Sequence, residues 1–202
     1  MAEQYLGLHI NYLGLNLTQC NEEYLNKDFY YYIRKMAEKD NIFSSKIKYD
    51  GLIDFKEFYK FCYQWLSEEA GLNLIEGKYA EKISGDAKGI DVEWKGMRKV
   101  TDYFMFQVDI KFKVLNLTNV EITQDGKKLK MNKGSVEVGI KGTLVRDYEG
   151  KFEKTSSQKF MRSIYEKWVI HSRIQEYEGK LVGDCNEFLS QAKAFLDLEG
   201  KR

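Results

Sequence analysis

Residues 103–115 read YFMFQVDIKFKVL, and they alternate apolar with polar side chains along most of this length. The apolar side chains occupy the even positions: Phe104, Phe106, Val108, Ile110, Phe112 and Val114. The positions between them include Gln107, Asp109, Lys111 and Lys113. Successive side chains of a strand point to opposite faces, so this pattern predicts a long strand with one buried face. The polar face predicts an antiparallel sheet that is covered on one side only.

Weaker strand signals lie on both sides of this stretch. Alternating patterns predict a first strand at residues 5–17, a weak strand at 74–84 and a firm strand around Ile90, Val92 and Trp94. A short strand is predicted at residues 119–123. The Asp125-Gly126 pair then predicts a tight hairpin, followed by a short segment containing Leu129 and Met131. The last long strand is marked by Val136, Val138, Ile140 and Leu144.

Two helices are predicted before the meander of strands. Residues 22–38 place apolar side chains three and four positions apart, as an amphipathic helix does. A second helix begins at Phe55, with Asp54 as its N-cap and Gly71 as its C-cap. The Asp50-Gly51 pair before it is interpreted as a turn. An EF-hand calcium loop is not favoured there, because Lys46 and Lys48 would occupy two ligand positions.

The C-terminal region is predicted to be helical. Residues 157–170 carry one apolar stripe, formed by Met161, Ile164, Tyr165 and Trp168. A longer helix follows, with a stripe formed by Ile174, Tyr177, Leu181, Cys185, Phe188, Leu189, Ala192, Phe195 and Leu196. Gly179 and Gly183 lie four residues apart in it. They would allow a close approach to the sheet, leave room for a ligand, or mark a bend.

These elements predict one α+β domain over residues 1–202: an antiparallel sheet of five to seven strands, covered on one face by helices, with a long C-terminal helix. The predicted order is a first strand at 1–17, two helices at 22–70, a meander at 74–146 and C-terminal helices at 157–198.

Composition limits the classes of partner. The formal net charge is +1, so overall electrostatics favours neither nucleic acid nor an anionic membrane as the default partner. One segment is basic: Lys127, Lys128, Lys130 and Lys133 cluster in the predicted hairpin of residues 127–146, with Lys141 and Arg146 further on. These cations would form a phosphate-binding patch or protect the edge of the sheet from pairing with another chain.

The sequence contains no recognisable catalytic or metal-binding motif. Its three cysteines, Cys20, Cys62 and Cys185, are far apart, and its two histidines, His9 and His171, have no partner close in sequence. We therefore expect no metal site, no cofactor and three reduced thiols. The start of the chain lacks a secretory signal and no apolar run reaches the length of a transmembrane helix, so we expect a cytoplasmic protein.

The order of strand, two helices, antiparallel strands and a long final helix resembles the helix-grip fold of the START and Bet v1-like superfamily. The extra helix at 157–170 departs from that order. The resemblance implies a lipid-like or aromatic small molecule held between the sheet and the final helix. Ligand contacts would come from Trp94, Phe104, Phe106, Val108 and Tyr177.

Three hypotheses about function follow. The first is a non-catalytic soluble protein that binds a hydrophobic small molecule. The second is a protein or ribonucleoprotein interaction module that uses the basic hairpin of residues 127–146. The third is an enzyme of the same fold, with a pocket carboxylate or His171 as its working group. We favour the first, and no catalytic residue is assigned.

Overall fold

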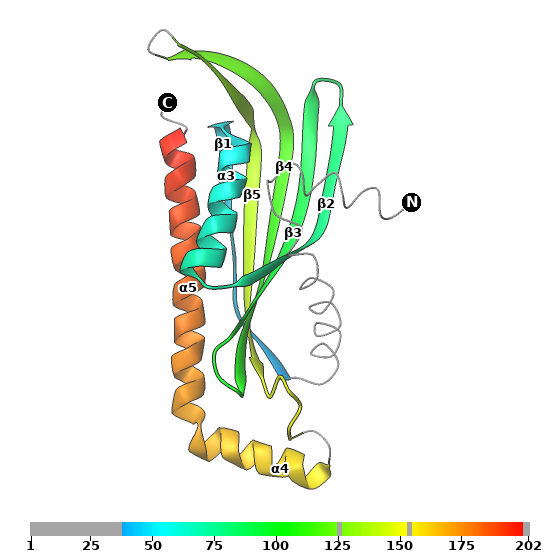
Figure 1. The fold of residues 1–202 in the computed structure, drawn as a ribbon, viewed down its shortest axis with the longest axis vertical. Helices are drawn as coiled ribbons and strands as arrows, with labels where there is room; N and C mark the ends of the chain where they lie inside the picture. Colours follow the sequence, from blue (N-terminus) through cyan, green and yellow to red (C-terminus); the bar gives the residue numbers. More distant parts are fainter. Residues whose placement is uncertain (1–37, 125–126, 153–154, 200–202) are drawn as a thin grey trace.

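The computed structural model describes residues 38–124, 127–152 and 155–199 (Figure 1). The predicted first strand at 5–17, His9 and Cys20 lie outside these residues. Residues 22–37 of the first predicted helix also lie outside them. Residue Glu38, which was placed at the end of that helix, is instead the first residue of a strand.

Within the described residues, five antiparallel strands form one open sheet. They are β1 (Glu38–Ile53), β2 (Asn73–Ser84), β3 (Ala87–Lys99), β4 (Phe104–Gln124) and β5 (Lys127–Arg146). The strand order across the sheet is β1-β5-β4-β3-β2. The chain therefore closes the meander by placing its last strand against its first described strand. This sheet and its helices confirm the predicted α+β class.

The described helices are α3 (Phe55–Gln64), α4 (Ser156–Ile164) and α5 (His171–Glu199). A π-helical turn extends α3 over Trp65–Glu69, and another extends α4 over Tyr165–Val169. Helices α3 and α5 pack on the same face of the sheet and form one core with it. Helix α4 lies crosswise beneath the end of the sheet, away from that core (Figure 1).

The alternation in β4 has the predicted result. All six apolar side chains at the even positions 104–114 are buried. Phe112 and Phe58 of α3 pack edge to face, and Phe104 packs against Tyr177 of α5. On the opposite face Lys111 pairs with Glu93 of β3 at 3.1 Å. The apolar side chains of β4 therefore face the helices and its charged side chains face solvent, as expected.

Strand β1 corrects the prediction for residues 22–70. Residues 38–53 were not assigned to a strand, and Asp50-Gly51 was interpreted as a turn. In the structure Asp50 and Gly51 lie in β1, opposite Ser135 and Gly134 of β5. A local turn signal is weak compared with the hydrogen bonds and packing of an antiparallel ladder, so the tertiary pairing prevails.

Strands β4 and β5 are longer than predicted. Each was divided in two, but both run unbroken, with an irregularity in their pairing between Leu115 and Thr118. Asn116 has a φ of 54° there. β4 has one extra residue at this irregularity, which shifts its alternation of buried and exposed side chains by one position. The buried side chain beyond it is therefore Leu117 and not residue 116. Gln124 pairs with Lys127, which confirms the two-residue hairpin connection.

The ends of the second predicted helix are confirmed. The Asp54 side chain accepts a hydrogen bond from the Glu57 backbone N–H at 3.1 Å, as an N-cap does. At the other end Gly71 has a φ of 61°, and the Leu72 N–H donates to the Leu66 carbonyl at 3.0 Å. Gly71 therefore ends the helical segment in the left-handed conformation that glycine favours.

The close approach between α5 and the sheet occurs at Gly142 of β5. A Cβ added there would lie 3.1 Å from the Cys185 Sγ atom and 3.2 Å from the Leu181 Cγ atom. A Cβ added at Gly179 or Gly183 would meet nothing within 4 Å. The small residue that permits helix–sheet contact is therefore in the strand, and the two helix glycines do not serve that purpose.

Candidate functional site

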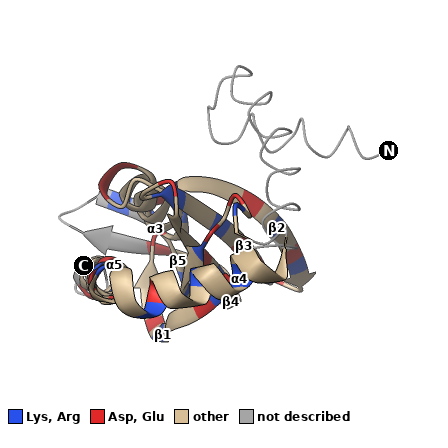
Figure 2. Cartoon of the chain, turned by 90° about the horizontal axis from the view of Figure 1, so that it is seen from below, with Lys and Arg blue, Asp and Glu red and all other residues tan. Residues whose placement is uncertain are grey.

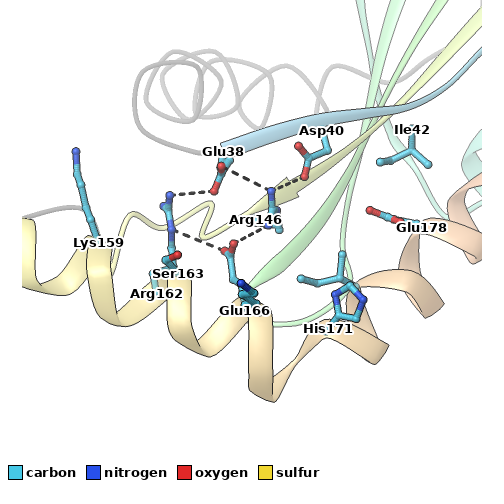
Figure 3. Close-up of a pocket in the computed structure, with 12 residues that line it drawn as sticks. Glu38, Asp40, Ile42, Arg146, Lys159, Arg162, Ser163, Glu166, His171 and Glu178 are labelled. Carbon is cyan, nitrogen blue, oxygen red and sulfur yellow. Dashed lines mark hydrogen bonds and ion pairs between the residues drawn. The ribbon is translucent and has the colours of Figure 1, made fainter.

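An ion-pair network holds α4 against the sheet (Figure 3). At its centre is Arg146, the last residue of β5. One terminal nitrogen of Arg146 lies 2.6 Å from Asp40 Oδ2 of β1, and the other lies 2.6 Å from Glu166 Oε2 of the turn after α4. Arg162 of α4 reaches Glu38 Oε2 at 2.9 Å. Two arginines thus join three elements of the fold.

The connection from β5 to α4 is fixed by a buried carboxylate. Asp147 is only 1% exposed, and its φ is 47°. Its side chain accepts hydrogen bonds from the backbone N–H groups of Lys151 at 2.8 Å and Phe152 at 3.0 Å. Arg162 Nη1 lies 3.9 Å away. Asp147 therefore shapes the turn and contributes another negative charge to the network.

Tyr103, the residue before β4, completes the network. Its hydroxyl donates a hydrogen bond to Glu166. Burial raises the pKa of this hydroxyl, and the neighbouring Glu166 carboxylate raises it further. Tyr103 therefore remains a neutral donor over the ordinary pH range. The carboxylate of Glu166 has a phenol on one side and arginines on the other.

Beside this network lies an open cleft of about 630 Å³. Its lining is mixed in charge and consists of Glu38, Asp40, Ile42, Arg146, Lys159, Arg162, Ser163, Glu166, Lys167, His171, Ile174 and Glu178. Both arginines of the cleft already form ion pairs with carboxylates that line it. This arrangement leaves the cleft without a concentrated charge of either sign.

His171 lies at the edge of the cleft, at the start of α5 (Figure 3). It is exposed, and its Nε2 atom lies 3.2 Å from Gln175 Nε2. Among the residues that the structure describes, no carboxylate, serine or cysteine forms a hydrogen bond with His171. Within the described residues, His171 therefore has neither an acid nor a nucleophile as a hydrogen-bond partner.

The five predicted ligand contacts are part of the packed core. Trp94, Phe104, Phe106 and Val108 are all buried, and Tyr177 is half-buried. They divide into two groups. Trp94 packs with aromatic side chains under α3, whereas Tyr177 lies against Phe104 and Phe106 beneath α5.

One small cavity lies beside two of these residues, between the sheet and α5. Its volume is about 10 Å³, which is at the lower limit for holding one water. Its lining includes Phe106, Val108 and Cys185. Arg98 lines it as well and pairs with Asp184 of α5 at 2.6 Å. A larger molecule would enter only if these groups moved apart.

Helix α4 presents an unusual outer face. The capping box of Thr155 and Gln158 begins the helix. The large apolar side chains of α4 and of the π-helical turn that extends it are exposed to solvent: Phe160, Met161, Ile164, Tyr165, Trp168 and Val169. Trp168 is 74% exposed and Phe160 is 65% exposed. No residue of α4 itself is buried. We call this set the α4 apolar face.

The basic hairpin lies at the other end of β5 from α4. Lys128, Lys130 and Lys133 are exposed, and the side chain of Lys127 lies outside the described residues. Arg146 belongs to the ion-pair network instead and is not part of this basic surface. The basic hairpin and the α4 apolar face therefore lie at opposite ends of β5.

Comparison with protein-family models found no match, and comparison with curated proteins found no match either. Within the described ranges, no group of three or more His, Cys, Asp or Glu side chains is arranged to hold a metal ion. Among the same residues, no helix is both long enough and apolar enough to cross a membrane.

Sequence reasoning identified the stripe of α4 but missed the ion-pair network. Glu38 and Arg162 are separated by 124 positions, so no local spacing indicates their contact. The exposure of Trp168 could not be predicted from the sequence either, because an apolar stripe shows which side chains share a face of a helix and does not show what covers that face.

Proposed function

We propose that this chain is a non-catalytic interaction module that docks through the α4 apolar face onto a surface that is itself apolar and negatively charged. One observation carries the proposal. The polar side of α4 is paired with its own domain through Arg162 and Glu166, while the apolar side faces solvent. A helix on the surface of a globular domain ordinarily has the reverse orientation.

The contiguity of the exposed apolar side chains supports docking. Single exposed apolar side chains are common on protein surfaces, but contiguous ones mark interaction sites. Phe160, Ile164 and Trp168 are spaced four residues apart and lie on one side of the helix. Met161 and Tyr165 continue the same surface. Since the ion pairs hold the helix in place, little ordering is needed when a partner binds.

The proposed partner chemistry comes from the charges beside this face. Lys159 and Lys167 are exposed, and neither forms an ion pair within the described part of the chain. The ammonium group of Lys167 lies 5.6 Å from the centre of the Trp168 ring. Unpaired cations around an apolar patch favour an anionic surface.

The test compares two variants of the full chain expressed in its own cells. The variant F160S/I164S/W168S removes the apolar face, and I83S removes one side chain that is 71% exposed elsewhere. Lipids and proteins that copurify with each chain are quantified by mass spectrometry. We expect the wild type and I83S to retain the same associated material and the triple variant to lose it. Equal recovery with all three chains would contradict the proposal.

A second proposal keeps the helix-grip resemblance and its small-molecule site. It is supported by the strand order β1-β5-β4-β3-β2, by α5 lying over the sheet and by the small cavity beside Phe106 and Val108. Binding would require the Arg98–Asp184 pair to open. Native mass spectrometry tests it: a copurifying small mass that R98A alters is expected, and bare protein after a hydrophobic-ligand screen would contradict it.

The basic hairpin supports a further interaction surface, because Lys128, Lys130 and Lys133 are exposed. If it binds an anionic partner, a K128E/K130E variant weakens that binding and reduces its dependence on salt. We also infer a cytoplasmic location, which is supported by the free thiols of Cys62 and Cys185.

A further inference from the structure

We infer that the partner of the α4 apolar face is an anionic lipid surface, on which α4 lies as an interfacial helix. This inference rests on the docking role proposed above and names the occupant. It concerns local charge and shape, because the net charge of +1 by itself does not indicate a membrane.

The side chains of the α4 apolar face suit the boundary between lipid headgroups and acyl chains. Interfacial helices carry Trp, Phe and aliphatic side chains on one face and lysines on the other. Trp168 and Tyr165 have a polar atom on an apolar ring, which suits this boundary. Lys159 and Lys167 have long stems that let their ammonium groups reach anionic headgroups.

The charges of α4 favour lipid over a second copy of the chain. The charged residues of the helical segment from Ser156 to Val169 are Lys159, Arg162, Glu166 and Lys167. Arg162 and Glu166 are held in the internal network, so the outward charges are Lys159 and Lys167 alone. Two such faces would bring lysine toward lysine. An anionic leaflet instead attracts them.

The position of α4 also fits a flat partner. The helix lies across one end of the molecule, with the sheet and α5 extending away from it (Figure 1). Seen from that end, α4 lies in front of the sheet (Figure 2). Its fourteen residues from Ser156 to Val169 correspond to a length of about 21 Å. This end can therefore rest on a bilayer surface without moving the core.

The experiment is cosedimentation of the full chain with vesicles. One set contains phosphatidylcholine alone, and the other contains phosphatidylcholine and phosphatidylglycerol at a ratio of about two to one. We expect the anionic vesicles to bind the chain about tenfold better, and added salt to weaken this binding. Trp168 reports contact directly through a blue shift in emission, since Trp94 is buried and Trp65 is half-buried.

Three variants assign the binding to α4. F160S/I164S/W168S should lose binding to both kinds of vesicle, while K159E/K167E should lose only the preference for anionic lipid. I83S is the matched control and should bind as the wild type does, because its exposed apolar side chain lies outside α4. Unchanged circular dichroism in the triple variant shows that the domain still folds.

The other outcomes separate failure of this inference from failure of the docking role. Absence of vesicle binding overturns the lipid surface. If sedimentation then shows a dimer that the triple variant abolishes, the occupant is a second copy and docking through α4 stands. If acrylamide does not quench Trp168 in the free full chain, another part of the chain covers this face, and both proposals fall.

Discussion

Arg146 at the end of β5 lies 2.6 Å from Glu166 in the turn that follows α4, and this pair is the centre of the contact between the helix and the sheet. The side chains are 14% and 11% exposed. Because Arg146 also pairs with Asp40 of β1, one side chain determines how α4 is presented to solvent.

Replacing Arg146 with Met should therefore destabilise the protein. The change leaves Asp40 and Glu166 without their shared cation in a partly buried place, at a cost of about 2–3 kcal/mol in the free energy of unfolding. Denaturant unfolding measures this cost. The control is Lys46→Met, which breaks the exposed pair with Glu137 and should cost less than about 1 kcal/mol. Similar costs for both variants would show that the network does not stabilise the fold.

Asp147 offers a test of the turn between β5 and α4. Asp147→Ala removes the acceptor of two backbone N–H groups and places Ala at a φ of 47°, so we expect a loss of about 2–3 kcal/mol. Asp147→Asn keeps one acceptor oxygen and a residue type that tolerates this conformation, and it should lose less. Thermal unfolding gives the order. An Asn variant as unstable as the Ala variant would contradict this account.

Two glycine substitutions should have opposite effects on stability. Gly142→Ala forces a methyl group against Cys185 and Leu181 and should cost about 1–3 kcal/mol. Gly179→Ala adds a methyl group in open space inside α5 and should stabilise the protein by about 0.5–1 kcal/mol. Denaturant midpoints measure both changes. Destabilisation by Gly179→Ala would mean that α5 approaches another surface there.

The thiols of Cys62 and Cys185 should resist alkylation in the native protein. Burial raises the pKa of the Cys185 thiol to about 12, with a smaller contribution from Asp184, and burial alone raises the pKa of the Cys62 thiol well above its ordinary value. Peptide mapping after iodoacetamide treatment at mildly alkaline pH measures the reactivity. Neither residue should be modified until a denaturant is added. Rapid native labelling of either residue would contradict the packing beneath α5 or α3.

The same pKa shift predicts how stability depends on pH. The thiol of an unfolded chain ionises near pH 8.5. Between that pH and about 12 the folded protein retains the Cys185 proton that the unfolded chain has lost, so the free energy of unfolding falls as the pH rises. A Cys185→Ala variant should show a smaller fall over this window. An identical slope in both proteins would remove Cys185 as a cause.

Several elements could be predicted because their signals are local. The buried face of β4 follows from a period of two, and the long stripe of α5 follows from a period of 3.6. The Asp54 cap is likewise defined by neighbours in sequence, since its side chain bonds the backbone of Glu57. These features depend on residues a few positions apart.

Other features required partners that are distant in sequence. β1 became a strand because β5, roughly 90 residues later, pairs with it and overrides the turn signal at Asp50-Gly51. Asp40, Arg146 and Glu166 form a network only once three elements meet at one end of the sheet. Periodicity indicated which side chains share a face of α4. The tertiary structure decided that the polar side chains face the domain and that Trp168 faces solvent, because ion pairing with the sheet orients the helix.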